Sequence, residues 1–251
     1  MRRRLPHLAA LLVVAAALLG AHPAWAKKPK SEAAKPDEPA DPKATAPTVA
    51  VLYFDVLAAA DSGLDVLRKG LAQMLVADLA DEPALRLVER DRLEALIAEQ
   101  KMQRSKGFDS RTAVRFGKLL GARYVILGTV TKLGATVQIA ARAVSVETGQ
   151  ILWAVSARGK DDDFFAIEGE LATRIREKLT AGLPPIKTTA VKRKQRRRPK
   201  KLSIQTATRY AQALDAKDRG DKAAARAGME KVVAEAPDFD LAYVDLQSMT
   251  N

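Results

Sequence analysis

Two acidic stretches hold the side chains that are best suited to chemistry. The stretch "VERDRLEALIAEQ", residues 88–100, places Glu, Asp and Arg at helical spacing, and "DDD", residues 161–163, holds three consecutive aspartates. Such carboxylates can act as general acids and bases or bind a hard cation such as calcium or magnesium. The aspartates have no ligand loop around them and precede a helical pattern. We therefore expect them to cap a helix and not to hold a metal.

The rest of the sequence argues against catalysis. The chain has no cysteine, and its two histidines, His7 and His22, lie within the first 26 residues. Beyond that point it cannot build the usual zinc site or a Ser-His or Cys-His nucleophile pair. Gly117-Lys118 lacks the upstream glycine and the following Ser or Thr of a phosphate-binding loop. We therefore predict a non-enzymatic protein with no cofactor and no metal. Any catalysis would have to rest on carboxylates, Lys or Tyr, and Asp161 or Asp162 are the residues whose substitution would test it.

The N-terminus has the pattern of a secretory signal peptide, residues 1–26. Its basic start, "MRRRLPH", is followed by an apolar run over 8–21 and by the small residues of Ala24-Trp25-Ala26. That run is shorter than the roughly 18 apolar residues that suggest a membrane-spanning helix. We predict an exported protein of the periplasm, peripheral to the outer membrane; an uncleaved membrane anchor is the alternative.

Composition divides the remaining chain into four parts. Residues 27–47 are rich in proline, alanine and lysine, which predicts a disordered spacer. Residues 48–184 have the apolar runs of a compact domain, and residues 185–202 form a basic linker. Residues 203–251 have helical periodicity and should form a small all-α helical hairpin.

The pattern within residues 48–184 predicts an α/β fold. Strand and helix signals alternate in the order strand-helix-strand-helix-helix-strand-strand-strand-helix. This order implies a mixed sheet with helices on its faces, in a three-layer arrangement. The run "TVAVLYFDV", residues 48–56, is expected to be one strand covered on both faces.

Three motifs in this domain resemble the CsgG-type curli secretion and assembly family. Related families are the flagellar outer-membrane protein and the activators of penicillin-binding proteins. The motifs are "VERDRLEALIAEQ", "GKLLGARYVILGTVT" and "ARAVSVETGQIL", which follow one another in the family's order. The residues that match are Glu89, Arg90, Leu93, Glu99, Gln100, Gly117, Gly121, Ala122, Gly128, Glu147, Thr148 and Gly149.

Most of these motif residues are expected to be structural. Glu89 lies where a helix begins, a position that favours a carboxylate. Gly121 lies in a tight turn between a helix and a buried strand, where a side chain would hinder the turn, and Gly149 suits the positive-φ corner of a hairpin. Arg90 and Gln100 are expected at solvated helix positions, with contact to a partner as the alternative.

The resemblance implies an accessory or scaffold protein in the secretion or assembly of surface structures. Such a protein would act through contacts with envelope proteins or through self-association. A component of an oligomeric outer-membrane secretion channel and an activator of a peptidoglycan synthase are the two alternatives. The family's pore-forming members resemble lipoproteins, whereas this chain has no cysteine to lipidate. Every strand-like run is also needed by the predicted sheet, which favours the accessory role.

The C-terminal segment resembles a tetratricopeptide unit. Gly220, Ala225, Met229 and Pro237 fall at that repeat's spacing. Only about one and a third repeats are present, whereas an independent array needs roughly three. We therefore expect the segment to pack on the α/β domain, on another subunit or on a partner.

The basic linker carries most of the net charge. Residues 185–201 contain nine Lys and Arg and no acidic residue, and with the three arginines near the N-terminus they account for the whole net charge of +12. Such a segment can bind anionic lipid, lipid A or a cell-wall polymer. Nucleic acid is a poorer candidate because aromatic residues for base stacking are missing. A linker without a specific ligand is the alternative. The candidates for polyanion contact are Lys192, Arg193, Lys194, Arg196, Arg197 and Arg198.

Overall fold

The computed structural model describes residues 46–59, 62–100, 108–181, 183 and 202–249. These residues belong to one compact unit, residues 40–251. The predicted signal peptide and the six candidates for polyanion contact lie outside the described residues. So do nearly all of the predicted spacer and the predicted basic linker.

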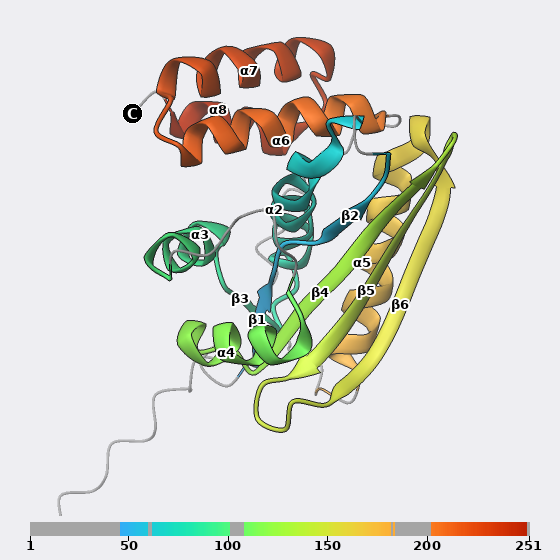
Figure 1. Cartoon of the computed structure of the whole chain (residues 1–251), viewed down its shortest axis with the longest axis vertical. Helices are drawn as coiled ribbons and strands as arrows, with labels where there is room; N and C mark the ends of the chain where they lie inside the picture. The colour runs from blue at the N-terminus through green and yellow to red at the C-terminus, as the bar shows by residue number, and fades with distance from the viewer. Residues whose placement is uncertain (1–45, 60–61, 101–107, 182, 184–201, 250–251) are drawn as a thin grey trace, which may run out of the picture. The chain divides into compact units, whose positions relative to one another are not determined.

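A six-stranded mixed sheet forms the centre of the described part. Its strands are β1 (Thr48–Val51), β2 (Asp55–Leu57), β3 (Arg86–Leu87), β4 (Tyr124–Leu133), β5 (Thr136–Ser145) and β6 (Ile151–Lys160). The order is β3-β1-β4-β5-β6, and β2 also pairs with β4. Strand β1 pairs in parallel with β3 and with β4, and β2 pairs in parallel with β4. Strands β4, β5 and β6 form an antiparallel meander. The predicted α/β class with a mixed sheet is confirmed (Figure 1).

One predicted strand is divided in the structure. The run over 48–56 forms β1 and β2, which are joined by Leu52, Tyr53 and Phe54 outside regular strand geometry. Both strands still pair with β4, in the registers Val51 to Ile126 and Asp55 to Thr129. The unbroken apolar run could not show this division, because all three joining side chains are buried like those of a strand.

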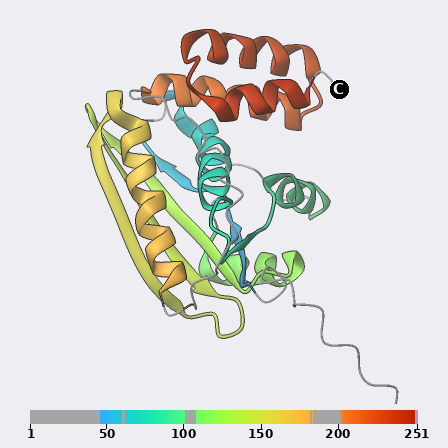
Figure 2. The same ribbon diagram turned by 180° about the vertical axis from the view of Figure 1, so that it is seen from behind.

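The helices occupy both faces of the sheet, but unequally. They are α2 (Leu67–Leu79), α3 (Arg90–Glu99), α4 (Ser110–Leu120), α5 (Phe164–Thr180), α6 (Ile204–Asp218), α7 (Lys222–Glu235) and α8 (Asp240–Ser248), with short 3-10 turns η2 (Leu64–Val66) and η3 (Asp161–Asp163). Helices α2 and α5 cover one face, and α4 packs on β4 and β5 at one end of the other face (Figures 1 and 2). The third layer is therefore partial. Beyond α4, the outer face of β4, β5 and β6 carries no helix of the described chain.

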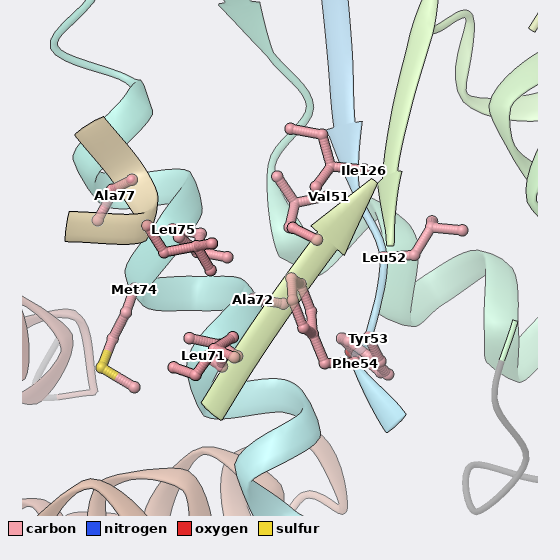
Figure 3. Packing of buried hydrophobic residues seen from close by; sticks show 14 of the residues in the cluster. Val51, Leu52, Tyr53, Phe54, Leu71, Ala72, Met74, Leu75, Ala77 and Ile126 are labelled. Carbon is pink, nitrogen blue, oxygen red and sulfur yellow. The ribbon is translucent and has the colours of Figure 1, made fainter. Parts of the chain in front are cut away.

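The main core lies between the sheet and the helices α2 and α5. Leu71 and Leu75 of α2 are fully buried together with Val51 and Ile126 of the sheet, as Figure 3 shows from close by. Gly128 of β4 lies in a crowded part of this core. A Cβ atom there would come within 2.0 Å of the Ala140 carbonyl oxygen and 2.5 Å of the Phe54 ring, so only glycine fits.

The C-terminal helices pack on the α/β part, which was one of the three packing partners expected for this segment. Helix α6 lies against α2 so closely that a Cβ atom on Gly70 would be 2.7 Å from the Cβ of Ala211. Helices α7 and α8 follow as neighbours of α6 and α7 respectively, with breaks near Gly220 and Pro237 as predicted. Over the described residues, no helix combines the length and apolar character needed to cross a membrane.

Candidate functional site

Arg90 is the motif residue whose position differs most from expectation. It is the first residue of α3 and is only 3% exposed, so the prediction of a solvated position was wrong. Its guanidinium donates two hydrogen bonds, of 2.8 and 2.9 Å, to the two carboxylate oxygens of Asp218. Asp218 ends α6 and is 128 positions away in sequence. Arg90 is buried because α6 covers the beginning of α3.

Further charged side chains surround this pair. Lys69 of α2 donates hydrogen bonds of 2.8 Å to Asp215 and 2.9 Å to Asp218, and its ammonium lies 3.6 Å from Glu94. We call this group the junction cluster; it consists of Tyr53, Lys69, Arg90, Glu94, Asp215 and Asp218. It joins the α/β part to the C-terminal helices through two cations and three carboxylates.

Burial and neighbouring charges shift the pKa values of Asp218 and Tyr53 in the junction cluster. Burial opposes ionisation of Asp218, but the hydrogen bonds and charges of Arg90 and Lys69 prevail and lower its pKa. Burial also raises the pKa of Tyr53, and its hydrogen bond to Glu94 adds to the rise against the opposing charge of Arg90. Tyr53 therefore stays a neutral donor and Asp218 a carboxylate at neutral pH. This arrangement suits a structural joint and not proton transfer.

A second candidate lies on the outer face of the sheet, beyond α4. There β4, β5 and β6 form an open recess of about 540 Å³. Its polar side chains are those of Thr129, Gln138, Arg142, Ser156 and Arg174, and the other lining residues are Gly, Ala and Val. No carboxylate is among the lining residues in the described part of the chain. The recess therefore has a positive character.

Arg142 lines this recess from β5, the central one of its three strands. It lies on β5 opposite Leu127 of β4 and Ala154 of β6. Its Nε atom is buried and has no hydrogen-bond acceptor among the described residues. Arg174 of α5 lies at the rim and is already engaged, because it donates to the Ser156 carbonyl oxygen and to the Glu170 carboxylate.

Several motif residues support the packing of helices and turns. Leu93 and Ala122 are buried. A Cβ atom on Gly117 of α4 would lie 2.5 Å from Val146 and 2.6 Å from Val125, so the glycine lets α4 approach the sheet closely.

Two motif glycines adopt a left-handed backbone conformation. Gly121 ends α4 with φ of 66°, and no atom lies near the place of a Cβ. The backbone angle and not the expected crowding therefore requires glycine at this position. Gly149 has φ of 72° in the turn between β5 and β6, where a positive φ was predicted.

The remaining polar motif residues are exposed and lie apart from one another. Glu89 immediately precedes α3, as expected, but its side chain makes no capping hydrogen bond. Glu99 and Gln100 lie at the far end of the same helix, and Thr148 lies in the β5–β6 turn, where its hydroxyl accepts from the Gln150 amide at 3.3 Å. The structure does not bring these side chains together into one site.

The three consecutive aspartates do not form a cluster for chemistry either. They make the turn η3 before α5, and Asp163 at the helix N-terminus accepts no capping hydrogen bond. Asp161 instead pairs with Lys132 at 2.7 Å. Among the described residues, no group of acidic residues, His or Cys is arranged to hold a metal ion.

Sequence reasoning missed the most unusual side chains, Lys69, Asp218 and Arg142. Lys69 and Asp218 are 149 positions apart, so no local pattern could have joined them. For Arg142 a signal existed. Gln138 and Arg142 fall on the same side of a strand by period-two alternation, opposite to a fully apolar side.

The sequence matches a protein-family model. Residues 40–138 match the family described as curli production assembly/transport component CsgG, which confirms the resemblance for the first two motifs; the third motif, residues 141–152, lies beyond the matched segment. A curated protein named putative adenylate cyclase 3, from Rhizobium meliloti (strain 1021), is 29% identical over 166 residues. That match covers 63% of this chain and 26% of the relative, so the chain spans about a quarter of the relative's length.

The chain also has a limited similarity to several solved structures, among them the following three. Lipoprotein GNA1162 from Neisseria meningitidis is 18% identical, with 55% of this chain and 99% of that chain covered and a TM-score of 0.39. LpoB from E. coli is 14% identical, with coverages of 64% and 89% and a TM-score of 0.39. The PelC dodecamer from Paraburkholderia phytofirmans is 14% identical, with coverages of 53% and 87% and a TM-score of 0.35.

Proposed function

We propose that this protein, whose residues 40–138 match the CsgG family, is a non-catalytic accessory or scaffold protein of the cell envelope. It acts through protein contacts in the secretion or assembly of surface structures. The family match carries the proposal, because the matched family is described as an assembly and transport component.

The outer face of the sheet supports a role in protein contacts. Strand β6 ends the strand order, so one of its edges has no partner strand among the described residues. Two of its side chains, Ile151 and Leu152, are 56% and 48% exposed. An open sheet face beside a free strand edge suits a protein partner, which can add backbone hydrogen bonds and cover apolar side chains.

The residue chemistry supports a non-enzymatic role. The charges of the junction cluster pair with one another, and the chain has no His or Cys beyond residue 26. The cyclase name belongs to a relative of which this chain matches only about a quarter. The cyclase activity in that name is not part of the proposal, since the nucleotide-binding fingerprints are missing from this sequence.

The proposal also assigns roles to the segments on either side of the α/β domain. Residues 1–26 are a cleaved signal peptide, and residues 27–47 tether the α/β domain, residues 48–184. Residues 203–251 are a tetratricopeptide-like unit that offers a second contact surface. The basic linker, residues 185–202, adds contact with an anionic lipid, lipid A or a cell-wall polymer.

Fractionation of native cells, with a high-salt wash of the membranes, tests this proposal. The mature protein should be periplasmic or leave the membranes with salt, because charge and protein contacts hold it there. Release by detergent alone would contradict the accessory role and favour a channel component. A cytoplasmic protein that keeps its first 26 residues would contradict export.

A further inference from the structure

The guanidinium of Arg142 lacks an acceptor within the described chain. Its Nε atom is buried, and neither of its strand neighbours, Leu127 and Ala154, has a side chain that could accept a hydrogen bond. Burying a charged donor without an acceptor is unfavourable. The Nε atom of the buried Arg90 also has no described acceptor, but both of its terminal nitrogens donate to Asp218. No such bond is described for the terminal nitrogens of Arg142, which lines the recess and can therefore take an acceptor that comes from outside.

The recess around Arg142 selects for a negative group. It combines two arginines with neutral polar side chains and no described carboxylate. Arg174 at the rim already binds Glu170 and a backbone carbonyl, so Arg142 is the cation that remains free to bind. A guanidinium binds planar two-oxygen anions through paired hydrogen bonds, and a carboxylate has this geometry.

The surroundings of the recess favour a protein as the source of that carboxylate. The recess is open and floored by small residues such as Ala140 and Ala154, which leaves room for an extended chain. Leu152 of β6 is 48% exposed and lies nearby, at the register shift between β5 and β6. An extended segment that crosses the recess can place an acidic side chain at Arg142.

We propose that the recess on the outer face of β4, β5 and β6 binds an acidic side chain of a partner protein, with Arg142 as the residue that receives its carboxylate. The proposal deepens the function given above and rests on it, because it names the chemistry of the partner segment. The partner is recognised as an extended segment that carries an acidic residue.

Titration of the purified chain with short peptides tests the proposal. The probes are a blocked pentapeptide of sequence TVEVT, its TVQVT counterpart and inorganic phosphate. The readout is the Nε–H resonance of Arg142, followed by NMR. TVEVT should shift this resonance saturably, and TVQVT should bind at least about tenfold more weakly because it lacks the charge-assisted pair.

Substitutions show whether Arg142 carries the binding. Arg142→Gln and Arg142→Lys should both weaken TVEVT binding, measured by the shifts of neighbouring backbone amides. The lysine variant keeps the positive charge, so it serves as a second test if the glutamine variant does not fold. Arg92→Gln, an exposed position on α3 outside the lining, should leave binding unchanged.

Three results would overturn the proposal. The first is that TVEVT and TVQVT bind equally well, or that neither binds. The second is that a folded Arg142→Gln variant still binds TVEVT fully. The third is that inorganic phosphate binds more tightly than TVEVT. The fractionation result is independent of all three, so failure of this inference is distinguishable from failure of the proposed function.

Discussion

Arg90 and Asp218 join the first turn of α3 to the last turn of α6 through two parallel hydrogen bonds. The pair connects a motif residue of the CsgG-like part to the C-terminal helices. Because Lys69 of α2 binds the same carboxylate, three helices meet at one buried acid. The junction cluster thereby fixes the C-terminal helices in one place on the α/β part.

Asp218→Asn should strongly destabilise the chain. The substitution leaves Lys69 and Arg90 buried with only part of their counter-charge, and breaking a buried pair in this way costs about 3–5 kcal/mol. Urea unfolding followed by circular dichroism measures the loss. Asp238→Asn, an exposed site with no described side-chain partner, is the matched control and should change stability by less than about 0.5 kcal/mol. Equal stability of the two variants would refute the role of the pair.

The same variant has a defined pH dependence. The folded pKa of Asp218 lies below the ordinary value of 3.8, so its contribution is present above that value and is lost as pH falls through the lower folded pKa. The difference in unfolding free energy between the wild type and Asp218→Asn should therefore shrink in acid below pH 3.8. A difference that stays constant from neutral pH into this range would contradict the ion pair.

Gly70→Ala should loosen α6 from α2. The added methyl group would lie 2.7 Å from the Cβ of Ala211, so α6 must shift. Hydrogen exchange should become faster in α6 and stay unchanged in β4 and β5. The double variant with Ala211→Gly should restore slow exchange, because it removes the opposing methyl group. An isolated helix would instead gain about 1 kcal/mol from Gly→Ala, and such a gain would show that the helices do not touch.

Glu168→Gln should stabilise the protein at alkaline pH. Glu168 of α5 is 1% exposed, and burial raises its pKa to about 8 against the opposing charge of Arg176. The folded state thus keeps a proton that the unfolded state releases above 4.5, the ordinary pKa of a glutamate. Wild-type stability should fall between pH 4.5 and 8 by up to about 1.4 kcal/mol per pH unit from this group.

The glutamine variant lacks this fall, so its advantage over the wild type should grow from pH 5 to pH 8 in urea unfolding. Glu170→Gln, an exposed position on the same helix, serves as control and should show no such growth. A parallel pH profile for Glu168→Gln and the wild type would contradict a raised pKa at this position.

Gly128→Ala should cost more stability than Gly134→Ala. At Gly128 the methyl group would overlap a backbone oxygen and the Phe54 ring, and overpacking of this kind costs about 1–3 kcal/mol or more. At Gly134 nothing lies near a Cβ, and only the φ of 58° opposes alanine, which costs roughly 1–2 kcal/mol. Thermal unfolding should give a lower midpoint for Gly128→Ala; the reverse order would contradict the close strand packing.

Local patterns in the sequence predicted much of the fold. The order of strands and helices follows from hydrophobic periodicity, and turn chemistry located the corner at Gly149 and the helix break near Gly220. The division of the first strand was missed because the joining residues Leu52, Tyr53 and Phe54 are as apolar as a buried strand.

The candidate sites were harder to predict, for a physical reason. Arg90 looks like an ordinary surface residue of an amphipathic helix, and only the packing of α6, more than a hundred positions away, buries it. Arg142 lies in a correctly predicted strand, but its missing acceptor depends on side chains of β4 and β6 together. Charge and burial at these positions are tertiary properties.

Photo-crosslinking in native cells tests the central claim, that this protein acts through contacts on the outer face of its sheet. A photoreactive phenylalanine analogue replaces exposed Ala154 on that face, and Glu177 on the exposed side of α5 as control. We predict a discrete adduct from position 154, identified by mass spectrometry as an envelope protein, that is missing from position 177. Failure of position 154 to form an adduct at native expression, or the same adducts from both positions, would contradict the claim.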